Sequence, residues 1–124
     1  MPRIRAINSM EDPKGLQLFQ EVLAKTKAGR IRWEPTANEL QYFSVLPGGV
    51  TLSVVETHEK DNWGSDVQDL VLVLRSDERE LLRVTSDIDD VGWKGLSELY
   101  ELARRQALRV DAAVDKVLGE LAKL

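Results

Sequence analysis

The sequence contains no cysteine and a single histidine among its 124 residues. The absence of cysteine excludes disulfide bonds, thiolate metal ligands and a thiol nucleophile. One histidine, with no nucleophile elbow around any serine, argues against a Ser–His–Asp triad. A glycine-rich phosphate loop is also missing, because Gly48 and Gly49 join two expected strands and do not open a helix. We therefore expect no cofactor and no enzymatic activity.

Long apolar runs are absent as well. No stretch approaches the ~20 apolar residues of a membrane helix, and the first residues lack the apolar run of a secretory signal. We therefore expect a cytoplasmic protein without a membrane partner. At 43% apolar and 31% charged residues, the composition is typical of a globular chain. We expect one domain over residues 1–124, with residues 1–11 as a loose N-terminal segment.

Charge is unevenly distributed around a net value of −4. Residues 1–34 carry seven basic and four acidic side chains, a balance of +3. Residues 56–69 (one basic, five acidic) and 77–90 (two basic, six acidic) each have a balance of −4. An acidic chain has little general affinity for a phosphate backbone, so a nucleic-acid partner is unexpected unless a local basic face provides it.

Two kinds of periodicity divide the chain. A helix is predicted from about Asp12 to Ala28, with Pro13 in its first turn, Gly29 just past its end, and a core-facing stripe of Leu16, Phe19, Val22, Leu23 and Thr26. Alternation and turn residues then predict strands at 30–34, 40–46, 50–57, 70–74 and 81–85, with a hairpin turn at Pro47-Gly48-Gly49 and a polar loop at 58–66.

After an expected loop over 87–95, a long helix is predicted from Leu96 to Leu124. Its apolar residues are spaced 3, 4, 4, 3, 4, 3, 4 and 3 positions apart, a mean of 3.5. At about 43 Å it would be longer than the roughly 35 Å width of a domain of this size. The helix therefore either breaks, for which Gly119 is a candidate, or its end packs on something else. The fold class is α+β: N-terminal helix, antiparallel four- to five-stranded meander, and long C-terminal helix on one sheet face.

Two acidic clusters raise the question of a metal site. His58 lies beside Glu56, Glu59 and Asp61. These residues span a strand end and a loop without converging spacing, so a solvated acidic loop is the plainer interpretation. The second cluster lacks the ligand spacing of a calcium loop, and helix capping accounts for it better: Asp87, Asp89 and Asp90. We expect no metal.

The basic residues near the end of the first helix form the candidate nucleic-acid surface: Lys25, Lys27, Arg30 and Arg32. Trp33 is adjacent, but its alternation with Ile31 points it into the core, away from the arginines. Trp63 lies in a polar segment and is either a lid on the core or an exposed anchor for a partner.

Two segments resemble a group of small, uncharacterised bacterial proteins. The segments are LAKTKAGRIRWEPT (23–36) and LSELYELARRQALRVDAAVDKVLGEL (96–121), about a third of the chain. The resemblance rests on the pattern Gly-x-Ile-x-Trp and on the pattern Leu-Tyr-x-x-Ala-Arg-Arg, that is, on Gly29, Ile31, Trp33, Leu99, Tyr100, Ala103, Arg104 and Arg105. It implies a helix, an antiparallel sheet and a closing helix, and it brings no activity with it.

The functional expectation is a non-enzymatic protein-interaction or regulatory module of a bacterial or mobile-element system, such as an immunity-like or inhibitory protein. The overlong helix suggests pairing with a protein partner or with its own copy in a homodimer. The candidate partner-binding residues are Trp63, Val114, Val117 and Leu121. The alternatives are a nucleic-acid-associated regulator that uses the basic N-terminal third, and a metal or small-ligand binder at the acidic loops.

Overall fold

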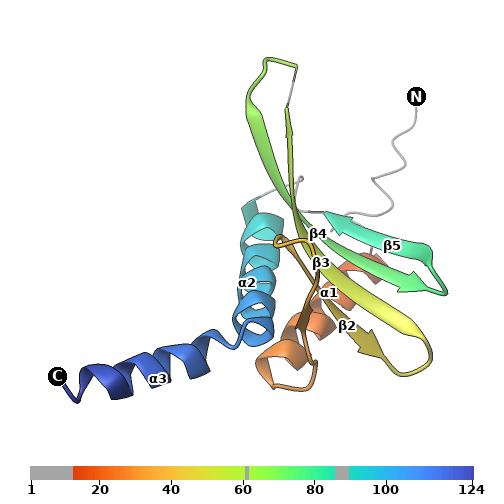
Figure 1. The fold of residues 1–124 in the computed structure, drawn as a ribbon. Coiled ribbons are helices and arrows are strands. Elements are labelled where there is room, and N and C mark those ends of the chain that lie inside the picture. Colours follow the sequence, from red (N-terminus) through yellow and green to blue (C-terminus); the bar gives the residue numbers. More distant parts are fainter. Residues whose placement is uncertain (1–12, 61, 86–89) are drawn as a thin grey trace, which may run out of the picture.

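The structure, a computed structural model, describes residues 13–60, 62–85 and 90–124. Helix α1 (Pro13–Lys27) precedes five strands, and two helices follow, α2 (Asp90–Ala107) and α3 (Val110–Leu121). The strands form one antiparallel sheet in the order of the chain: β1 (Glu34–Pro35), β2 (Gln41–Leu46), β3 (Val50–Lys60), β4 (Asp66–Ser76) and β5 (Arg79–Thr85). Helices α1 and α2 pack on one sheet face, and α3 extends away from the body (Figure 1). The predicted α+β fold is confirmed, while the segment 1–11 and Asp12 lie outside the described residues.

Helix α1 ends where its sequence predicts. Gly29 has a φ of 72°, and the adjacent backbone N–H of Arg30 donates to the carbonyl of Lys25 at 2.8 Å, which closes the helix end. The buried face consists of Gly15, Phe19, Val22 and Thr26. Leu16 was placed on this face and is 38% exposed, because it is about 100° around the helix from Gly15.

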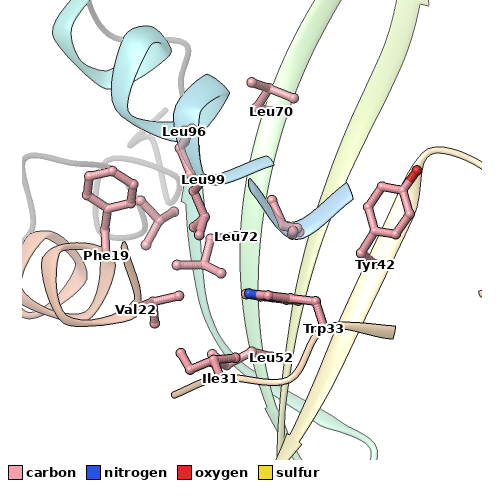
Figure 2. Packing of buried hydrophobic residues seen from close by; sticks show 13 residues of the cluster. Phe19, Val22, Ile31, Trp33, Tyr42, Leu52, Leu70, Leu72, Leu96 and Leu99 are labelled. Carbon is pink, nitrogen blue, oxygen red and sulfur yellow. The ribbon is translucent and has the colours of Figure 1, made fainter. Parts of the chain in front are cut away.

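The core lies between this sheet face and the two helices (Figure 2). Its central side chains from β3, β4 and α2 are fully buried, as the alternation in β3 and the apolar stripe of α2 predict: Leu52, Val54, Leu72, Leu96 and Leu99. Residues 70–73 of β4 are all at most 4% exposed, so this strand is shielded on both faces, as five consecutive aliphatic residues indicate. Helices α1 and α2 approach closely at Gly95, where an added Cβ would lie 2.7 Å from Cζ of Phe19.

The hairpin turn predicted at 47–49 is confirmed. Gly48 and Gly49 both have positive φ, 88° and 78°, between β2 and β3. The turn from β4 to β5 uses Asp77 and Glu78 at φ of 52° and 68°, without a glycine.

The strand predicted at 30–34 is wrong in extent. Only Glu34–Pro35 pairs with the sheet, at its edge. The predicted alternation nevertheless holds, since Ile31 and Trp33 are 7% and 2% exposed and Arg32 is exposed. The ladder is missing because the backbone N–H of Trp33 donates at 2.6 Å to Oε1 of Gln106 on α2.

Three further boundaries differ from the prediction. The polar loop at 58–66 is mostly strand, because β3 continues to Lys60 and β4 begins at Asp66. Helix α2 begins at Asp90, inside the loop expected over 87–95 (86–89 lie outside the described residues). The single long helix is two helices, and the break falls at Leu108 and Arg109; Gly119 lies within α3.

Candidate functional site

Helix α3 is exposed from Asp111 to Leu121, and Val110 at its start is half-buried. None of its twelve residues is buried, and all twelve belong to the described part of the chain. The predicted residues Val114, Val117 and Leu121 are 47%, 55% and 55% exposed, and Leu118 is 57% exposed. Because they recur every three or four positions, they form one apolar stripe on the helix. In Figure 1 the helix extends from the end of α2 with no other element beside it.

The junction between α2 and α3 has a defined geometry, although the apolar face of α3 is exposed. Arg109, between the two helices, is in the left-handed region with a φ of 53°. The guanidinium of Arg105 on α2 donates to the carboxylate of Asp111 on α3, and this contact raises the pKa of Arg105. The junction therefore sets a direction for α3 that leaves its stripe facing solvent.

A shallow groove of about 330 Å³ follows the stripe. It is lined only by apolar side chains: Leu108, Val110, Ala113, Val114, Val117 and Leu118. Leu108 and Leu118 were not among the predicted partner-binding residues. The signal for Leu118 was available in the sequence, because it follows Val114 by four positions and widens the stripe by one residue on its flank.

Trp63 lies at the tip of an arm formed by the ends of β3 and β4 (Figure 1). Its side chain is 89% exposed, so the lid interpretation is wrong. The arm is acidic, and an ion pair across it joins Lys60 to Asp66 at 2.7 Å. The arm and α3 extend from different ends of the molecule, so Trp63 and the α3 stripe are two separate exposed apolar features.

The basic residues of the nucleic-acid hypothesis are all exposed. The adjacent Trp33, however, is not available to stack on a base. Lys27 is paired with Glu98 of α2 at 2.9 Å. Trp33 is 2% exposed, and its indole Nε1–H donates to Oγ1 of Thr26 at 3.0 Å. Its ring is therefore a core element, as its alternation predicts, and offers no face to a base.

The candidate metal ligands around His58 form one side-chain pair and not a cluster. Nε2 of His58 lies 2.5 Å from Oε2 of Glu56, two positions earlier on the same face of β3. Glu59 points to the opposite face by strand alternation, and Asp61 is outside the described residues. Within the described ranges, no three His, Asp or Glu side chains converge as metal ligands. Asp87 and Asp89 fall outside those ranges.

Perturbed ionisable groups in the described residues have structural causes. The hydrogen bond from Arg83 lowers the pKa of Glu80, and the two side chains are 2.9 Å apart on the exposed surface of β5. Burial, with the nearby Tyr42 and Glu56, raises the pKa of Tyr100 to about 12. The Tyr42 and Tyr100 rings meet edge to face at 5.6 Å. Surface pairing and packing therefore account for these pKa shifts.

Comparison with known proteins gave no match to a family, to a curated protein or to a solved structure. None of the helices in the described part of the chain is long and apolar enough to cross a membrane.

Proposed function

We propose that the protein is a non-enzymatic protein-interaction or regulatory module that binds its partner through α3. The observation that supports this is a twelve-residue helix with no buried residue and an apolar stripe about half exposed. An isolated helix of this length is marginal in water, because most helical stability comes from packing of the apolar face. Contiguous exposed apolar surface of this kind marks an interaction site.

The cellular role we propose is that of an immunity-like, inhibitory or regulatory protein in a bacterial or mobile-element system. The resemblance described above supports a bacterial setting, and the absence of cysteine and of a nucleophile elbow argues against nucleophilic catalysis. Trp63, at the tip of an acidic arm, is a second anchor for a large partner with a basic rim.

Site-specific photo-crosslinking in living cells tests this proposal. A photoreactive phenylalanine analogue at Val117 lies on the stripe, whereas the same analogue at Gly119 lies about 200° around the helix. Gly119 is a matched control because a side chain added there meets nothing within 4 Å. We expect a discrete adduct from position 117 and none from position 119. Equal labelling at both positions, or none at either, would contradict a role for the stripe.

A nucleic-acid-associated regulator remains the second candidate. Arg30 and Arg32 are exposed and form no ion pair with any described carboxylate, and Arg32 shares a cavity of about 570 Å³ with Arg109. Binding through these charges would weaken steeply as salt rises. A gel-shift series at low and physiological salt, with R30A/R32A as the variant, tests it. A protein that binds no DNA or RNA at low salt would eliminate this candidate.

A further inference from the structure

The apolar stripe of α3 has the same residue spacing in both directions along the helix. Its positions within the helix are spaced 4, 3 and 4 residues apart: Val110, Val114, Val117 and Leu121. Two such helices placed antiparallel about a two-fold axis bring every stripe residue against another one. The layers are 110 with 121 and 114 with 117, each formed twice. A self-complementary pattern of this kind is what an isologous interface requires.

We propose that α3 pairs with α3 of a second copy of this chain, in antiparallel orientation. The inference rests on the proposed function and names the partner of that surface. Each copy would cover the groove lined by Leu108, Val114 and Leu118 on the other.

The shape of the molecule favours the antiparallel orientation. Helix α3 extends away from the body (Figure 1), so antiparallel pairing leaves the two bodies at opposite ends of the helix pair. A parallel pair would bring both bodies to the same end. Because each helix has only twelve residues, the contact area falls at the low end for specific interfaces. The dimer therefore forms in a concentration-dependent equilibrium.

Disulfide trapping of the full chain tests the orientation, because the natural sequence has no cysteine to interfere. In the antiparallel pair, a mixture of V110C and L121C brings the two thiols into one layer. In either variant alone, the equivalent thiols lie about 16 Å apart along the axis, too far for a disulfide. We expect the mixture to form a disulfide dimer under mild oxidation, while each variant alone stays at the level of the outward-facing control K116C. Dimers from V110C alone would indicate parallel pairing and overturn the proposal.

Analytical ultracentrifugation provides the second measurement. We expect the mean mass of the natural chain to rise towards a dimer with concentration, and V117D to raise the dissociation constant at least ~100-fold, since each dimer would bury two unpaired charges. A monomer at every concentration would overturn self-pairing. If photo-crosslinking at position 117 then captures a different protein, the interaction module stands and only the second copy is wrong. If position 117 captures nothing either, both proposals fail.

Discussion

The contact between α1 and α2 at Gly95 permits a sharp test of the packing. In Gly95→Ala the new methyl would lie 2.7 Å from Cζ and 3.0 Å from Cε2 of Phe19. Real side chains do not tolerate such distances, so the Phe19 ring or α1 must shift. Phe19 is 7% exposed within the core, which leaves its ring little free space.

The magnitude follows from two opposing effects. Overpacking a core by one methyl costs about 1–3 kcal/mol. Replacing glycine by alanine within a helix contributes about 1 kcal/mol in the opposite direction. We therefore expect G95A to lower the free energy of unfolding by about 1 kcal/mol and Tm by about 4 °C.

Chemical denaturation followed by circular dichroism measures this change. Gly119→Ala is the matched control, since it makes the same substitution in a helix where nothing lies within 4 Å of the new methyl. We expect G119A to increase helicity without lowering Tm. Trimming the ring in the F19L background should remove most of the cost of G95A, as expected for coupled neighbours. A G95A variant as stable as G119A would refute the close approach of the two helices.

Three other expectations concern single side chains. Thr26→Val removes the acceptor of the Trp33 indole N–H and should cost about 1–3 kcal/mol in urea denaturation, whereas T26S should retain most of the stability. Because the pKa of Tyr100 is about 12 in the folded chain and ~10 in an unfolded one, its contribution to stability is complete below pH 10 and is lost between pH 10 and 12. Absorbance titration at high pH should therefore show a step near pH 12 that Y100F lacks, and a step near pH 10 in its place would contradict the burial of Tyr100. Val117→Asp should leave the Tm of dilute monomer unchanged, because Val117 is 55% exposed, and a clear loss would mean that α3 packs on the body.

Local sequence patterns predicted most of the fold, because helix ends, turns and side-chain alternation depend mainly on residues that are close in sequence. Gly29 marks the end of α1, and Gly48 and Gly49 specify a hairpin turn because both adopt positive φ. The in–out alternation of Ile31 and Trp33 placed both side chains correctly. It did not predict whether the backbone pairs with a strand, because that depends on Gln106, far away in the sequence.

Two features could not be read from periodicity. The ends of β3 and β4 are solvated on both faces, so they carry no apolar alternation and their polar composition resembled a loop. No glycine or proline lies at the helix break at Arg109, and the 3.5-residue spacing of the apolar residues continues across it. That spacing identified the stripe residues Val114 and Val117. It could not show that the stripe leaves the core after Ala107, because core-facing and partner-facing stripes have the same period.

The arm that carries Trp63 has a consequence for solubility. Within the described residues, β2 pairs with β3 only as far as Val55, and β5 pairs with β4 only from Val71. Beyond Glu56, whose backbone N–H donates to the carbonyl of Leu40, the outer edge of β3 has no partner strand among the described residues. An open strand edge of this kind is a template for aggregation with other chains. Charged side chains such as Glu59 and Asp66 make such strand addition unfavourable, because stacking two arms would align like charges. The acidic character of the arm thus has a role in every copy of the protein, with or without a partner: it keeps the longest strands of the sheet from growing into a fibre.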